Sequence, residues 1–170
     1  MSIVGRFVEV AKLVLSMKCR DFLRFFVDCV PKVQIVGEDE TLEDIIDEML
    51  RGASYIVIVD RRGRLRGALS YLDILHHLAS ESKHMHTPMA TAIPGMRSLE
   101  LSDRSSSIRI SLIARPLPPK IREDATVEEA LKNMVMTESP YIIVVDKNDN
   151  VLGVITQHSI FRAISMKMRS

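Results

Sequence analysis

The sequence has no tryptophan, and aromatic residues make up only 5% of its 170 positions. This scarcity argues against an aromatic platform that stacks nucleic-acid bases. An excess of charge of one sign is also lacking, because 23 Lys and Arg residues are balanced by 22 Asp and Glu residues. Nucleic acid is therefore not expected as a partner, although a local basic patch is compatible with this composition.

Cysteines and long apolar runs are scarce as well. Two cysteines, Cys19 and Cys29, are too few for a disulfide framework in a chain of this length, so we expect reduced thiols in a cytoplasmic protein. The longest uncharged stretch near the N-terminus runs from Leu13 to Met17. A membrane span needs about 18 apolar residues, and no leader pattern precedes this stretch, so we expect no membrane insertion.

The common catalytic signatures are absent too. The sequence contains no phosphate-binding loop, dinucleotide fingerprint, zinc-protease helix or nucleophile elbow. His76 and His77 are adjacent on an expected helix, where neighbouring side chains point about 100° apart. No cysteine pair or glutamate nearby completes a ligand set. We expect neither an enzyme nor a metal site.

What the sequence does contain is an internal repeat. The segment DETLEDII, which begins at Asp39, corresponds to DATVEEAL, which begins at Asp124. YIVIVD from Tyr55 corresponds to YIIVVD from Tyr141, and LRGALS from Leu65 corresponds to VLGVIT from Val151. Two copies of one supersecondary unit are therefore expected.

Each copy predicts the element order β-α-β-β-α. The first helix opens with a capping box, Thr41 with Asp44 in one copy and Thr126 with Glu129 in the other, and continues with an apolar stripe at helical spacing. The expected strands are residues 33–36, 55–59 and 65–70, and then 120–122, 141–145 and 151–156. The continuous apolar runs at 55–59 and 141–145 indicate strands that are covered on both faces. A unit of about 50 residues buries little surface alone, so the copies should pack together.

These patterns divide the chain into four parts. We expect an N-terminal helical extension over residues 1–30, a first repeat over 31–80, a linker over 81–114 and a second repeat over 115–170. The alternating patch Ile108–Leu112 could add one extra strand.

The ordered motifs resemble a tandem of CBS domains (the cystathionine β-synthase regulatory module). The resemblance rests on D-x-T-[LV]-x-[DE], the apolar strand that ends in Asp, and Gly-x-[LI]-[ST], and it covers residues 30–80 and 115–168. It implies an α+β fold in which two β-α-β-β-α repeats pack as a pseudo-symmetric pair. It also implies no obligatory cofactor, a regulatory adenosine compound such as AMP, ADP, ATP or S-adenosylmethionine, a homodimer, and a separate effector protein.

The ligand signature that the resemblance implies, [ST]-x-x-D, lies at Ser70 to Asp73. A hydroxyl and free N–H groups at a helix N-terminus favour phosphate, and the Asp73 carboxylate could accept both ribose hydroxyls. The other expected contacts of this site are Ile35, Ser54, Tyr55 and Ile56. The structural alternative is that Ser70 only caps the helix and Asp73 only complements its positive end.

The second copy departs from this signature, because Ser159 stands where the aspartate is expected. A neutral hydroxyl cannot replace a bidentate carboxylate, so this site could be empty, weaker, or occupied in another pose. The candidate contacts there are Lys120, Ser139, Tyr141, Thr156, His158, Ser159 and Arg162. For His158 and Arg162, a phosphate contact and a solvated helix position remain equally open.

Two functional hypotheses follow. The first is an adenine-nucleotide sensor that acts on a separate partner protein. The second is a ligand-free dimerisation or scaffold module, favoured by the missing aspartate and by the apolar cluster around Phe22 and Phe25. A nucleic-acid contact through Arg61, Arg62 and Arg64 is a third and weaker idea, because charged strand edges also serve to prevent unwanted pairing.

Overall fold

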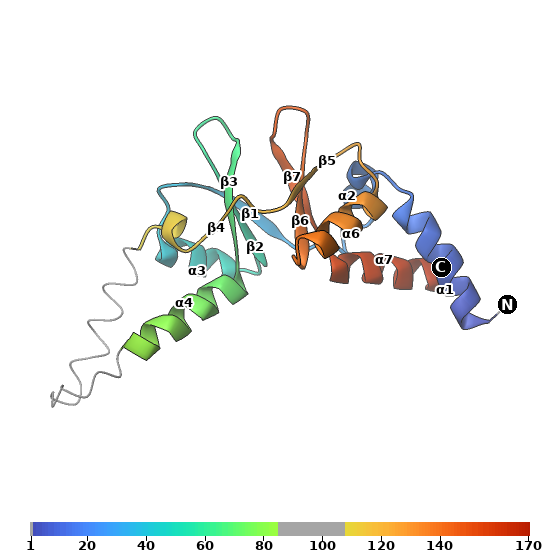
Figure 1. The fold of residues 1–170 in the computed structure, drawn as a ribbon, viewed down its shortest axis with the longest axis horizontal. Helices are drawn as coiled ribbons and strands as arrows, with labels where there is room; N and C mark the ends of the chain where they lie inside the picture. The colour runs from blue at the N-terminus through green and yellow to red at the C-terminus, as the bar shows by residue number, and fades with distance from the viewer. Residues whose placement is uncertain (1, 85–107) are drawn as a thin grey trace. The chain divides into compact units, whose positions relative to one another are not determined.

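The chain forms an α+β structure with two β-sheets (Figure 1). The computed structural model describes residues 2–84 and 108–170. The elements in chain order are α1 (Ile3–Leu15), α2 (Cys19–Phe25), β1 (Val33–Gly37), α3 (Leu42–Leu50), β2 (Tyr55–Val59), β3 (Leu65–Ser70), α4 (Tyr71–His84), the 3₁₀ helix η1 (Ile110–Leu112), β4 (Arg115–Pro116), β5 (Lys120–Arg122), α6 (Val127–Met136), β6 (Tyr141–Val145), β7 (Val151–Thr156) and α7 (Gln157–Arg169). The predicted β-α-β-β-α order is confirmed in both repeats.

The chain divides into two compact units, each with its own sheet and core. Unit 1 comprises Met1–Val33, Gly63–Leu65 and Pro118–Ser170, and unit 2 comprises Gln34–Arg62 and Arg66–Leu117. Most of the first repeat therefore belongs to unit 2. The second repeat belongs to unit 1, together with the N-terminal helices.

The sheet of unit 2 has the strand order β1-β2-β3-β4, which places β1 and β4 at its edges. The predicted capping box opens α3: the Thr41 N–H donates to the Asp44 carboxylate at 3.0 Å, and the Asp44 N–H donates to the Thr41 hydroxyl at 3.4 Å. The core beneath the helix consists of apolar side chains from α3, β2, β3 and neighbouring segments, namely Leu42, Ile45, Ala53, Ile56, Ile58, Leu69, Ile74 and Ile110.

The alternating patch Ile108–Leu112 does not form the strand that we considered. Residues 110–112 form η1, and Ile110 is fully buried in the core of unit 2. Backbone bonds fix this segment at the start of α3, because the Leu42 N–H donates to the Ile108 carbonyl at 2.9 Å and the Ile110 N–H donates to the Glu40 carbonyl at 3.1 Å. Burial of Ile110 in this core thus favours the 3₁₀ helix over a strand in this segment.

An added strand does occur three residues further on. β4 pairs antiparallel with β3, with Pro116 opposite Gly67. It joins the sheet of unit 2, although the sequence assigned residue 115 onward to the second repeat. The remaining linker, residues 85–107, lies outside the described residues.

In unit 1, β5 pairs parallel with β6, and β6 pairs antiparallel with β7. All five residues of β6 are buried, which confirms the strand covered on both faces. The second capping box also forms, because the Thr126 N–H donates to the Glu129 carboxylate at 2.7 Å.

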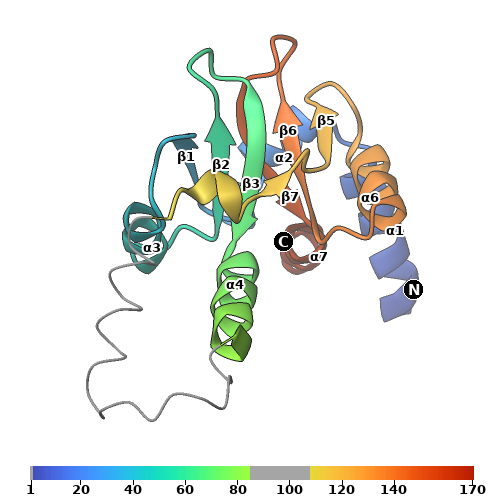
Figure 2. The ribbon, with the colours of Figure 1, turned by 60° about the vertical axis from the view of Figure 1, so that its left-hand side comes forward.

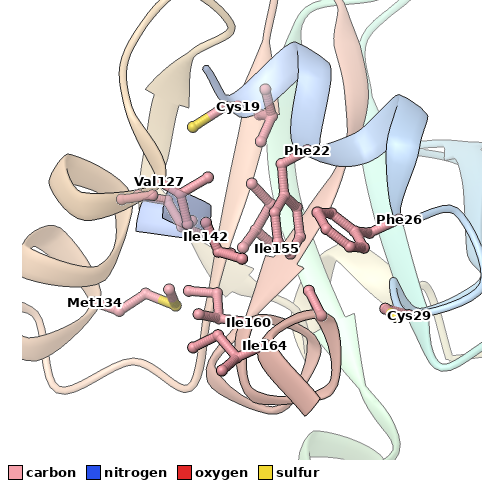
Figure 3. Close-up of a cluster of buried hydrophobic side chains, with 14 residues drawn as sticks. Cys19, Phe22, Phe26, Cys29, Val127, Met134, Ile142, Ile155, Ile160 and Ile164 are labelled. Atoms are coloured by element: carbon pink, nitrogen blue, oxygen red, sulfur yellow. The ribbon is translucent and has the colours of Figure 1, made fainter. Parts of the chain in front are cut away.

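The two N-terminal helices pack into the core of unit 1 (Figure 3). Phe22 and Phe26 from α2 lie against Ile142 and Ile155 of the sheet, and their own rings are 5.2 Å apart. Backbone bonds reinforce this packing: the Cys19 N–H donates to the carbonyl of residue 125 at 2.8 Å. The helical extension before the first repeat therefore completes the core of the second repeat.

The predicted apolar cluster of α2 is divided between two environments. Phe22 and Phe26 are buried, whereas the Phe25 side chain is 67% exposed. Phe25 is thus the residue of this cluster that is available to a partner. Among residues 2–84 and 108–170, no helix is long and apolar enough to cross a membrane.

Candidate functional site

The ligand signature of the first repeat lies where β3 ends and α4 begins. Ser70 is the last residue of β3, and Asp73 lies in the first turn of α4; both are partly buried. The Asp73 Oδ2 atom accepts bonds from the Ser70 N–H at 2.7 Å and from the Ser70 hydroxyl at 2.8 Å, and the Asp73 N–H donates to the Ser70 hydroxyl at 3.4 Å. This is the capping geometry that the structural alternative predicts.

Capping of α4 is compatible with ligand binding. Both bonds that reach the carboxylate use Oδ2. A carboxylate offers about four lone-pair sites, so Oδ1 supplies a further acceptor beside it. The bonds from Ser70 also hold the Asp73 side chain in one orientation, which reduces the entropy that a bound hydroxyl group would otherwise cost.

Tyr55, at the start of β2, lies within electrostatic reach of Asp73. Burial raises the pKa of the Tyr55 hydroxyl above its usual range, and negative charge on Tyr71 and Asp73 raises this pKa further. The structure therefore brings together two of the predicted contacts, Tyr55 and Asp73. It also adds Tyr71, an exposed residue inside the signature that the sequence analysis did not single out. Tyr71 could have been identified from the sequence by its position between Ser70 and Asp73.

The other expected contacts of the first site have different environments. Ile35 lies on edge strand β1 and is 47% exposed, and Ser54 is partly buried just before β2. Ile56 is fully buried among the core side chains of unit 2. Ile35 and Ser54 are therefore accessible from solvent within this unit, whereas the Ile56 side chain packs in the core.

The equivalent junction in the second repeat lies between β7 and α7, and its serine is inaccessible to solvent. Ser159 is 0% exposed, and its hydroxyl donates to the Thr156 carbonyl at 2.8 Å while it accepts from the Thr156 N–H at 2.9 Å. The Thr156 hydroxyl in turn accepts from the Ser159 N–H at 2.9 Å. The hydroxyl and the backbone N–H of this serine thus both bond to Thr156. His158 and Arg162 are exposed on α7.

The remaining candidates of the second site also have protein partners. The buried Ser139 hydroxyl donates to the Tyr141 carbonyl at 2.8 Å, and Tyr141 itself is buried at the start of β6. The Lys120 ammonium group contacts both oxygens of the Asp149 carboxylate at 2.9 Å. These contacts favour structural roles for Ser139 and Lys120. No group of three or more metal-ligating side chains occurs within the described ranges.

Comparisons with known proteins agree with this architecture. The CBS domain family model matches residues 22–80 and 111–166, which is more than half of the chain, so the chain belongs to the CBS-domain family. A comparison with curated protein sequences gave no significant match.

Several solved structures share the fold. The CBS domain of a CBS-domain-containing membrane protein from Sphaerobacter thermophilus is 21% identical, with a TM-score of 0.70 over 94% of this chain and 95% of that chain. A CBS domain protein from Pyrobaculum aerophilum, complexed with AMP, is 18% identical, with a TM-score of 0.63 over 90% and 98%. CBSX2, also in complex with AMP, is 17% identical, with a TM-score of 0.61 over 90% and 98%. At these identities the likeness defines the fold.

Proposed function

We propose that this chain is a sensor of adenosine compounds that binds its ligand at the β3–α4 junction and acts on a separate partner protein. The observation that carries the proposal is the Asp73 carboxylate, which Ser70 holds at a partly buried helix start beside Tyr55. Two structural neighbours were solved with AMP, which supports this ligand class. The ligand acts only through different affinities for two arrangements of the protein.

We propose further that each chain has one such site. Asp73 corresponds to Ser159, which has no carboxylate and uses its hydroxyl within the fold. Opening that junction would break buried hydrogen bonds, each of which contributes about 0.5–1.5 kcal/mol. The second repeat therefore serves as a scaffold, with His158 and Arg162 as solvated helix residues.

Thermal denaturation with AMP, ADP, ATP and S-adenosylmethionine tests the first proposal. A ligand that binds only the native state at 100 times its dissociation constant adds about 2.7 kcal/mol to the free energy of unfolding. We expect at least one of the four compounds to raise the melting temperature, and Asp73→Ala to remove most of the increase.

The matched control is Glu129→Ala, because Glu129 completes the capping box of α6 in the other repeat. Both variants lose the acidic partner of a capping box and should lose some stability, but only Asp73→Ala should lose the response to ligand. An unchanged melting temperature with all four compounds would refute the sensor proposal.

A second candidate function is a ligand-free dimerisation module. It is favoured by apolar side chains that lie exposed on helices, among them Phe25, Leu75, Met136 and Phe161. Exposed apolar surface of this kind marks interaction sites when it is contiguous. We propose that the chain forms homodimers, with or without ligand.

Sedimentation analysis of Phe25→Asp tests this second candidate. Phe25 projects from α2 with 67% of its surface exposed, so the substitution should leave the core intact. We expect the variant to dissociate at higher protein concentrations than the wild type, because its dimer is weaker. A dimer that is unchanged by Phe25→Asp would show that this residue lies outside the interface.

A further inference from the structure

The edge strand β1 carries none of the usual features that prevent an exposed strand from pairing. Its sequence is VQIVG, without a charged residue or a proline. It lies at the end of the unit 2 sheet, beside β2 (Figure 2). An edge strand presents unpaired N–H and C=O groups, and proteins ordinarily protect such edges with charges, prolines or bulges.

The second repeat provides an internal comparison. β5 is the corresponding edge strand of the unit 1 sheet, and it carries Lys120 and Arg122. These cations align with Ile35 and Gly37 of β1. The same element of the same chain is thus protected by charge in one copy and unprotected in the other.

A groove of about 800 Å³ runs beside β1. One wall is the β1 segment from Gln34 to Gly37, and the other wall comes from α3 and the residues just before it. Apolar side chains are exposed in the groove, with Ile35 at 47%, Ile46 at 38% and Leu50 at 81%. A groove of this size, next to an open edge, can hold an extended segment.

The wall formed by α3 and the residues before it is acidic. Five residues with carboxylates line it, namely Glu40, Glu43, Asp44, Asp47 and Glu48, and none of the described lining residues is lysine or arginine. Arg51 pairs with Asp47 at 2.6 Å and with Glu48 at 3.2 Å, so one cation is shared by two of the five. Hydrogen bonds from Thr41 lower the pKa of Asp44, which keeps that carboxylate charged at neutral pH.

We propose that the β1 edge and this groove bind an extended segment of a partner protein in which basic residues alternate with apolar ones. The segment would add to the sheet through backbone hydrogen bonds, as in β-strand addition. Side chains of a strand alternate between its two faces, so basic residues on the face toward α3 would approach its carboxylates. Apolar atoms of the segment would lie along Ile35 of β1. The argument for this surface does not use Asp73, although Ile35 lines the groove and is also an expected contact of the adenosine site.

The experiment measures binding of a labelled short peptide of alternating arginine and valine to the full chain by fluorescence anisotropy. We expect binding that weakens as salt concentration rises, because salt screens exposed charges. The pair Glu40→Gln and Glu43→Gln should weaken it about two- to thirty-fold, the range for two exposed ion pairs. Glu128→Gln is the matched control, since Glu128 occupies the position of Glu43 in the second repeat, and it should leave binding unchanged.

Gly37→Arg tests the strand edge itself, because it restores the cation that Arg122 supplies in the second repeat. A Cβ atom at Gly37 meets no other atom within 4 Å, so this variant should fold normally. We expect it to abolish binding of the peptide.

Three results would overturn the proposal. The first is no measurable binding, and the second is equal binding of a peptide with glutamate in place of arginine. The third is self-association of the chain that Gly37→Arg suppresses, which would make a second copy the occupant. Peptide binding measured on Asp73→Ala separates this test from the adenosine site. This variant should lose the response to adenosine compounds and still bind the peptide.

Discussion

Asp73 and Ser159 occupy equivalent positions in the two repeats, and their side chains form different hydrogen bonds. A carboxylate keeps an acceptor oxygen available after it has capped a helix, whereas the Ser159 hydroxyl donates its single proton to the Thr156 carbonyl and accepts from the Thr156 N–H. The aspartate is partly buried and the serine is fully buried. One substitution therefore leaves a polar group for a ligand in the first repeat and closes the second.

Cys19 illustrates a buried group without a chemical role. Burial raises the pKa of its thiol to about 12, and the negative charge of Glu129 contributes to the same shift. The thiolate is the reactive form of cysteine, so this thiol should be inert at neutral pH.

We expect Cys19 in a Cys29→Ala variant to react with Ellman's reagent at pH 8 only after unfolding in urea. The same shift has a consequence for stability. Because the pKa in the folded state exceeds the usual thiol pKa of about 9, the stabilising contribution of the neutral thiol is fully present below about pH 9 and is lost as pH rises through about 12. Rapid reaction of the native protein would contradict the buried position of Cys19.

At the scale of elements, the N-terminal helices are part of the folded core of unit 1. Phe22 and Phe26 pack with the side chains of β6, β7, α6 and α7, and α2 is tied to the residues before α6 by backbone bonds. These helices therefore stabilise the second repeat, although they precede the first repeat in the sequence.

Phe22→Ala tests this contribution. Removal of a buried phenylalanine ring costs about 3–5 kcal/mol, so we expect a loss of that size in the free energy of unfolding measured with urea. Phe25→Ala is the control three residues away. It should change the stability by about 0.5 kcal/mol or less, because the Phe25 side chain is 67% exposed. Equal losses for the two variants would contradict the packing of α2.

The elements that the sequence predicted correctly are those encoded locally. Thr41, Thr126 and their acidic partners define helix starts within four residues, and the run from Tyr141 to Val145 defines its own strand. The position of Ile110 could not be predicted in this way, because its conformation depends on packing against core side chains of unit 2 that are distant in the sequence. The packing of α2 against the second repeat also depends on residues that are distant in the sequence.

The candidate site was predictable to the same degree. The spacing from Ser70 to Asp73 indicated either a capped helix start or a ligand site, and the structure has the capping geometry. The burial of Ser159 and Ile56 and the acidic groove beside β1 depend on tertiary packing, which no local pattern encodes.

In the whole molecule, the two repeats share one fold but differ in their proposed binding functions. The proposed ligand site lies in the first repeat, whereas the second has a closed junction and a charged strand edge. The proposed peptide surface also belongs to the first repeat. Both proposed binding functions thus lie in the copy that makes up most of unit 2, and unit 1 provides the larger core.

Isothermal titration of the purified, nucleotide-free protein with the compound that gives the largest thermal shift tests the central claim most directly. The account predicts one binding site per chain, no binding to Asp73→Ala, and unchanged stoichiometry for Ser159→Ala. Two sites per chain, or one site that persists in Asp73→Ala, would contradict it.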